Sequence, residues 1–197
     1  CRGWRMCVSA CPYKKTYYGW STGKSEKCIL CFPRQEAGDA PACFHSCVGR
    51  IRYLGVLLYD ADRIKDVAMH ADGELAAAQR DIILDPHDPA VIEAARQEGI
   101  PSDWIEAAQR SPIWKLMQYE VALPLHPEYR TMPMVWYIPP LSPVVDVVTG
   151  SGNDGEDART LFAAIDKLRI PIAYLAELFT AGDIAPVDAA LRRLAAM

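Results

Sequence analysis

The chain opens with the stretch Cys1-Arg-Gly-Trp-Arg-Met-Cys7-Val-Ser-Ala-Cys11-Pro12. A second group of cysteines follows as Cys28-Ile-Leu-Cys31 and Cys43-Phe-His-Ser-Cys47. These groups contain all 7 cysteines of the 197 residues, with the spacings C-x5-C-x3-C-P and C-x2-C-x11-C-x3-C. Because thiolates are strong ligands for soft metals, this concentration of cysteines points to a sulfur-ligated site.

Three kinds of cysteine site compete for this pattern. A disulfide scaffold is typical of small secreted domains with an even cysteine count, whereas here the count is odd and no secretory signal is visible. A zinc-stapled interaction module needs two C-x2-C-like pairs; Cys28 and Cys31 supply one, but the second is C-x3-C and three upstream cysteines are left over. The bacterial ferredoxin run C-x2-C-x2-C-x3-C-P fits best, so we favour iron–sulfur ligation and keep the other two as alternatives.

The first cysteine group keeps the ferredoxin frame with one ligand replaced. Cys1 takes the first ligand position, Cys7 the third and Cys11 the fourth, which in two-cluster ferredoxins binds the neighbouring cluster. Trp4 occupies the second position, and an indole cannot bind iron. A site that lacks one of four thiolates should lose the iron at that corner, so we expect a [3Fe-4S] cluster here.

The second cysteine group has the same frame with an insertion before its third cysteine. Cys28, Cys31 and Cys43 would bind one [4Fe-4S] cluster, and Cys47 would bind an adjacent one. Completing all these sites would take about eight further cysteines. We therefore expect the sequence to be a fragment of a four-cluster subunit, and we expect it to complete none of the clusters alone.

The charge of the chain changes along its length. Residues 1–59 carry nine basic and three acidic side chains, a net charge of +6, whereas residues 60–197 carry a net charge of −10. We therefore expect an iron–sulfur cluster-binding segment over 1–59 and a mainly helical packing and subunit-contact region over 60–197. Positive charge beside a cluster raises its reduction potential. Four lysines near the cysteines are candidates for that role: Lys14, Lys15, Lys24 and Lys27.

Apolar periodicity after residue 59 predicts helices, which gives an α+β fold with a ferredoxin-like segment followed by a mostly helical region. Asp88 and Ser102 are N-terminal signals, and Gly99 is a stop signal. The expected strands are Ile51–Tyr59, which would close the cluster segment, and Val135–Ile138. The expected helices are Ala61–Ala71, Gly73–Ile83, Pro89–Glu98, Ser102–Ser111, Glu156–Leu168, Ile172–Phe179 and Ile184–Ala196.

Composition excludes two classes of function. The overall net charge of −4 argues against a dedicated nucleic-acid binder. No window reaches about 18 uninterrupted apolar residues, so no direct membrane span is expected. No nucleophile–base pair or carboxylate dyad stands out, so we expect no catalytic residue in this chain.

Several stretches resemble one known family, the beta subunits of respiratory, membrane-bound nitrate reductases. The resemblance is carried by the Trp-substituted cysteine run Cys1–Lys15, by Gly23–Cys31 and by Cys47–Asp62, and it resumes at Pro133–Pro143. It resumes again at Leu168–Leu175 and continues through Thr180–Asp183. The resemblance covers almost the whole sequence, and nothing is recognised over Val144–Asp157.

The resemblance implies an electron-transfer subunit with three [4Fe-4S] clusters and one [3Fe-4S] cluster. Such a subunit passes electrons from a haem-b membrane gamma subunit to a molybdenum-cofactor alpha subunit that reduces nitrate in anaerobic respiration. It lies on the cytoplasmic face of the cell membrane and is peripheral to it. The beta subunits of nitrite oxidoreductase and chlorate reductase are the nearest alternatives.

The resemblance also implies a role for each site residue. Cys1 and Cys7 look like ligands of the three-iron cluster, with Trp4 in the vacant corner. Cys11 looks like the fourth ligand of the adjacent cubane, and Cys47 like the last ligand of the cluster nearest the molybdenum subunit. The remaining three look like ligands of a further cubane: Cys28, Cys31 and Cys43.

Overall fold

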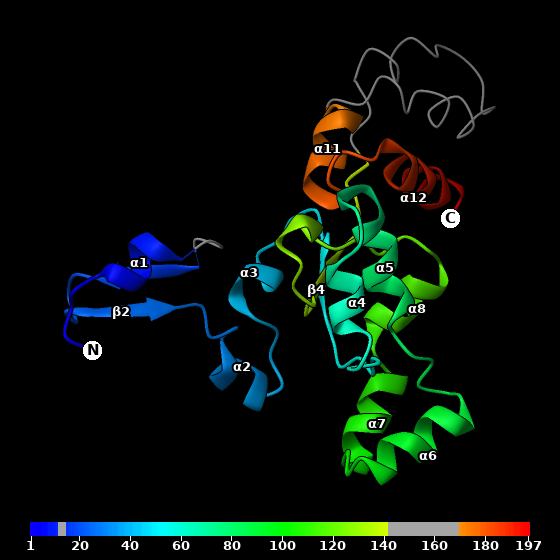
Figure 1. Cartoon of the computed structure of the whole chain (residues 1–197), viewed down its shortest axis with the longest axis horizontal. Helices are drawn as coiled ribbons and strands as arrows, with labels where there is room; N and C mark the ends of the chain where they lie inside the picture. The colour runs from blue at the N-terminus through cyan, green and yellow to red at the C-terminus, as the bar shows by residue number, and fades with distance from the viewer. Residues whose placement is uncertain (12–14, 142–169) are drawn as a thin grey trace. The chain divides into compact units, whose positions relative to one another are not determined.

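The computed structural model describes residues 1–11, 15–141 and 170–197 (Figure 1). The chain divides into two units, Cys1–Val48 and Gly49–Met197. The described residues form helices together with two small antiparallel sheets, which gives the α+β class that the sequence predicts. Within the described ranges, no helix is long and apolar enough to span a bilayer.

The first unit is built around a β-hairpin. Strand β1 (Thr16–Gly19) pairs antiparallel with β2 (Lys24–Lys27), with Thr16 opposite Lys27. Gly23 closes the turn at a φ of +67°, a conformation that glycine adopts without steric cost, and its N–H donates to the Gly19 carbonyl at 2.8 Å. Three short helices complete the unit: α1 (Met6–Ala10), α2 (Phe32–Glu36) and α3 (Ala42–His45).

The second unit combines short helices with a second two-stranded sheet. Strand β3 (Arg52–Leu54) pairs antiparallel with β4 (Val135–Tyr137), whose Trp136 is fully buried. Among its described residues, the α-helices are α4 (Ile64–Ala68), α5 (Leu75–Asp81), α6 (Pro89–Gln97), α7 (Ser102–Gln109), α8 (Pro112–Gln118), α11 (Ile172–Phe179) and α12 (Ile184–Ala196). Two 3₁₀ turns are η1 (Asp72–Glu74) and η2 (Pro127–Tyr129).

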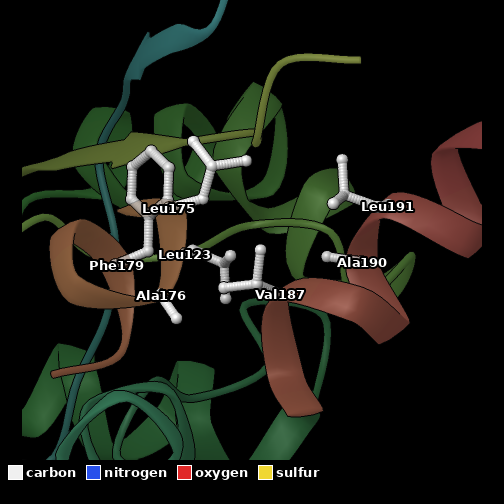
Figure 2. Close-up of a cluster of buried hydrophobic side chains, with 7 residues drawn as sticks. All are labelled: Leu123, Leu175, Ala176, Phe179, Val187, Ala190 and Leu191. Carbon is white, nitrogen blue, oxygen red and sulfur yellow. The ribbon is translucent and has the colours of Figure 1, made fainter. Parts of the chain in front are cut away.

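The apolar core of the described residues lies in the second unit and contains two clusters. In one, α11 and α12 pack their apolar faces together and against Leu123, as Figure 2 shows for Phe179, Val187 and Leu191. In the other, Trp136 packs with Ile113 and its neighbours on α8. Burying each of these large side chains contributes about 1.5–3 kcal/mol, so this unit is stabilised by ordinary hydrophobic burial.

The helices with clear local signals form where the sequence predicts them. The bounds of α11 and α12 agree with the prediction, and α6 ends one residue earlier than expected. The Asp88 carboxylate accepts the Ala90 N–H at 2.8 Å and so caps α6, and Gly99 follows this helix at a φ of +79°. Pro101 rather than Ser102 stands at the N-cap of α7. The expected helix Glu156–Leu168 lies outside the described residues.

The prediction of a strand over Ile51–Tyr59 that closes the cluster segment is wrong. Within this range only Arg52–Leu54 forms a strand, and its partner β4 belongs to the second unit. Gly55 follows the strand and lies close to Ser111, the N-cap of α8: a Cβ on residue 55 would lie 2.3 Å from the Ser111 hydroxyl, so a glycine is needed there. The helices expected over Ala61–Ala71 and Gly73–Ile83 are also shorter in the structure, as α4 and α5.

Candidate metal centre

Cys1 lies in a turn that contacts the β-hairpin of the first unit. Its Sγ accepts the Gly3 N–H at 3.4 Å and the N–H of Ser25, on β2, at 3.3 Å. Gly3 has a φ of +72°, and a Cβ there would lie 3.1 Å from the Tyr18 hydroxyl. This turn therefore directs two backbone N–H groups at the sulfur of Cys1, one of the candidate ligands.

Arg5 ends this turn and begins α1, which carries Cys7. Its φ is +62°, and its carbonyl accepts the Val8 N–H at 2.9 Å. Its guanidinium carbon lies 5.4 Å from the ring centroid of Tyr18 and 5.2 Å from that of Trp20, within cation–π range. The two rings pack edge to face at 5.0 Å. A positive charge is therefore held by aromatic rings between two of the candidate ligands.

The second cysteine group lies in a sharp turn followed by two short helices. The Cys28 Sγ accepts the Leu30 N–H at 3.4 Å. Leu30 and Cys31 both adopt the left-handed conformation, with φ of +52° and +51°, and the Cys31 carbonyl then accepts the Arg34 N–H at the start of α2. Cys43 lies on α3 and Cys47 follows that helix. Two consecutive left-handed residues are costly for non-glycine side chains, and such backbone strain is concentrated at functional sites in proteins.

None of the seven cysteines is paired in a disulfide within the described residues. Four are exposed and three are half-buried; the half-buried ones are Cys11, Cys31 and Cys47. This arrangement gives no support to a disulfide scaffold. It leaves the sulfur atoms accessible to an inorganic cluster, whose formation requires thiolates.

In the described part of the chain, no three His, Cys, Asp or Glu side chains lie close enough to hold one metal ion. The structure thus does not bring Cys28, Cys31 and Cys43 together as a single-ion site. A structural zinc ion needs four ligands around one point, whereas each cysteine of an iron–sulfur cluster binds a different iron atom. Thiolates serve both kinds of centre, and the cysteine spacing follows the ferredoxin run rather than two C-x2-C pairs.

The other predicted site residues lie around these turns. Trp4 is 82% exposed, between Cys1 and the start of α1. Lys24 and Lys27 occupy the two ends of β2 and are exposed, as is Lys15 just before β1. None of these three lysines forms an ion pair with another described residue. Lys14 lies outside the described residues.

Two contributors to the site were missed by sequence reasoning, namely Gly3 and Ser25. Gly3, two residues after Cys1, could have been predicted to form a turn around this cysteine, because glycine adopts a positive φ without steric cost. Nothing local marked Ser25, since its contact with Cys1 spans 24 residues and depends on the hairpin.

Two family models match the chain. One is described as "4Fe-4S dicluster domain" and matches residues 1–57. The other is described as "Respiratory nitrate reductase beta C-terminal" and matches residues 141–197. The first model covers the cysteine-rich first unit, and the second covers α11 and α12.

Curated relatives match the whole chain. The nitrate reductase beta chain of Bacillus subtilis is 55% identical over all of this chain and 41% of its own length. The respiratory nitrate reductase 1 beta chain of Escherichia coli is 56% identical over all of this chain and 38% of its own length. The chlorate reductase subunit beta of Ideonella dechloratans is 37% identical over 92% of this chain and 38% of its own length.

This chain therefore spans about two fifths of the length of the curated relatives it matches. Identity to the nitrate reductase beta chains extends across both units and exceeds the identity to the chlorate reductase subunit. With a dicluster model at one end and a nitrate reductase beta model at the other, the chain belongs to the family of respiratory nitrate reductase beta chains.

Proposed function

We propose that this chain is part of an electron-transfer subunit that relays electrons through iron–sulfur clusters to a molybdenum-cofactor alpha subunit, which reduces nitrate. The electrons would come from a haem-b gamma subunit in the membrane, with this subunit on the cytoplasmic face. The observation that carries the proposal is the Trp4-substituted ferredoxin frame in a chain 55% identical to a nitrate reductase beta chain.

The seven cysteines would supply the cluster ligands. Cys1 and Cys7 would hold a [3Fe-4S] cluster with Trp4 at its vacant corner, and Cys11 and Cys47 would each contribute one ligand to an adjacent [4Fe-4S] cluster. Cys28, Cys31 and Cys43 would hold a further [4Fe-4S] cluster. The remaining ligands would come from the part of the subunit that this chain does not span. When bound, such clusters supply one-electron transfer without substrate chemistry.

The chain's own residues would position the ligands and adjust their electrostatics. The Gly3 and Ser25 amides direct two N–H groups at the Cys1 sulfur, and hydrogen bonds to cluster sulfurs raise the reduction potential. Arg5, Lys24 and Lys27 add positive charge, which favours the more anionic reduced state. The substrate reduction itself would take place in the partner alpha subunit.

Two other classes remain as alternatives to this proposal. A beta subunit of chlorate reductase or nitrite oxidoreductase would have similar cluster wiring, but the chlorate reductase relative is only 37% identical. A zinc-stapled interaction module would use the same cysteines without redox chemistry. The two alternatives need different measurements, because only the second predicts a different metal.

The proposal is tested on the full-length subunit, purified without oxygen, by iron, sulfide and zinc analysis together with low-temperature EPR. We expect a three-iron signal in the oxidised protein and further four-iron signals on reduction. Zinc without iron or sulfide, and no EPR signal in either state, would overturn the electron-transfer function. Assays of the assembled complex with nitrate and chlorate, driven by a reduced viologen, would then separate the two oxyanion reductases.

A further inference from the structure

A groove of about 480 Å³ lies within the second unit, and all of its lining residues belong to that unit. One wall is the extended segment 56–62, and the other is formed by α6, α7 and the loop between them. Its volume is within the range of sites that accept several side chains or a small ligand. Nothing in the proposed electron relay uses this groove.

Both walls of the groove are held by contacts of their own. The segment 56–62 is fixed by two backbone hydrogen bonds, from Asp60 N to the Ile82 carbonyl and from Leu84 N to the Leu58 carbonyl, both at 2.9 Å. The turn between α6 and α7 is fixed by the bond from Ile100 N to the Ala95 carbonyl, also at 2.9 Å. The groove is therefore formed before any ligand arrives, which lowers the entropic cost of binding.

The groove presents apolar side chains to solvent. Trp104 is 58% exposed, and Tyr59 and Val56 on the opposite wall are 44% and 37% exposed. Leu84 and Val91 also line it. Large aromatic side chains beside an apolar cleft are the usual anchors of protein interfaces. An apolar segment of a partner would gain contact area on both walls at once.

The charged side chains of the groove have one sign. Asp60, Asp62 and Glu98 line it, and none of the described lining residues is Lys, Arg or His. The neighbouring Arg63 is paired with Asp81 at 2.6 Å, and this hydrogen bond, with the charges of Asp81 and Asp60, raises the pKa of Arg63. The acidic groove thus repels inorganic anions and anionic membranes, and it attracts basic segments.

We propose that this acidic groove docks a basic amphipathic segment of a partner subunit, whose apolar side chains enter between Trp104 and Tyr59. Lys or Arg residues that flank those side chains would pair with Asp60, Asp62 and Glu98. The charge of the groove matches that of residues 60–197 as a whole, which carry a net charge of −10. The identity of the partner as another subunit of the complex rests on the proposed function.

The first test is site-specific photo-crosslinking in the assembled complex of the full-length subunit. A benzoylphenylalanine at position 104 should crosslink to a partner-subunit peptide in which Lys or Arg flank an apolar stripe. The same probe at Tyr119, which is 56% exposed and outside the groove, is the control. A crosslink from position 104 to another segment of the same chain, or the same partner peptide from both positions, would overturn the proposal.

The second test measures binding of the full-length subunit to its separately purified partner. Trp104→Ala should weaken binding about tenfold or more, because it removes an aromatic anchor. Asp62→Lys with Glu98→Lys should slow association about tenfold at low salt, and the difference should shrink at high salt. Glu93→Lys reverses a charge on α6 outside the groove and should leave binding unchanged.

Circular dichroism melting of each variant checks folding, and iron content with EPR checks the clusters. Normal clusters with unchanged binding in Trp104→Ala and the double charge reversal would overturn the docking proposal while leaving the electron-transfer function intact. Absence of clusters in the unmodified subunit would instead contradict the proposed function, whatever the groove binds.

Discussion

In the second unit Leu123, Trp136 and Leu191 expose none of their surface, whereas in the first unit Pro41 is the only buried residue among those described. The first unit instead exposes large apolar side chains, among them Trp4 at 82% and Val48 at 99%. The two units thus differ in what can stabilise them. Hydrophobic burial accounts for the second, and something other than burial within the described residues must order the first.

The first unit resembles small domains that need disulfides or a bound metal to be stable. Its hairpin has two strands of four residues, and its helices have five residues or fewer, lengths that are marginal in isolation. Small domains with such weak cores commonly depend on metal ligation. The concentration of all seven cysteines in this unit fits that dependence.

Removing the clusters should have the largest effect. Because metal binding and folding are coupled in small metal domains, on a scale of about 10 kcal/mol, chelation should unfold the first unit of the full-length subunit. Hydrogen exchange should then show loss of protection over Thr16–Lys27, while Leu123 and Leu191 remain in a protected core. Equal loss of protection in both units would show that the second unit also depends on the clusters.

A cavity in the apolar core formed by α11 and α12 should have the next largest effect on stability, and this effect should be confined to the second unit. Leu191→Ala removes a fully buried side chain of the same apolar cluster as Leu123 and should cost about 2–5 kcal/mol. Leu191→Met, which conserves volume, should cost less than about 1.5 kcal/mol. Thermal unfolding with parallel iron analysis measures both. A loss of iron in Leu191→Ala at low temperature would show that the order of the first unit also depends on the apolar core of the second.

The difference between the units also explains which elements the sequence could predict. The helices α6, α11 and α12 have apolar periodicity and local start or stop signals, so their positions follow from neighbouring residues. Helix α8 was not predicted, although Pro112 stands at its N-terminus. The pairing of β3 with β4 joins residues more than eighty positions apart, and no local pattern specifies it.

The hairpin of β1 and β2 was also missed, because Lys24-Ser-Glu-Lys27 has none of the apolar or β-branched residues typical of strands. For the candidate site, cysteine spacing and Trp4 could be read directly from the sequence, and their roles stay predictions. The contacts of Cys1 with Gly3 and Ser25 depend on this hairpin, so they could not be read in the same way.

Replacing Arg5 should have a smaller effect. This change tests whether a positive charge in the first unit raises the reduction potential of a cluster. Arg5→Gln removes the cation held by Tyr18 and Trp20 and should lower the reduction potential of the three-iron cluster. An interaction of about 0.2–1 kcal/mol corresponds to roughly 10–40 mV for a one-electron step. Redox titration followed by EPR measures the shift.

Two variants serve as controls for this shift. Arg5→Lys keeps the charge and should recover most of the potential, whereas Arg2→Gln removes a charge from the same turn without altering the contact with the two rings. If Arg2→Gln lowers the potential as much as Arg5→Gln, the ring-held position of Arg5 has no special role, and only the overall charge of the turn matters.

Trp4→Cys should change stability least, because Trp4 is 82% exposed and contributes little packing; we expect less than about 0.5 kcal/mol in thermal unfolding of the full-length subunit. Its effect should be on the metal: a fourth thiolate would complete the ferredoxin frame, raise the iron content by about one atom and replace the three-iron EPR signal with a four-iron one. Trp4→Phe, which adds no ligand, should keep the three-iron signal. An unchanged three-iron signal in Trp4→Cys would show that Trp4 is not at the vacant corner of the cluster, and that another residue takes that position.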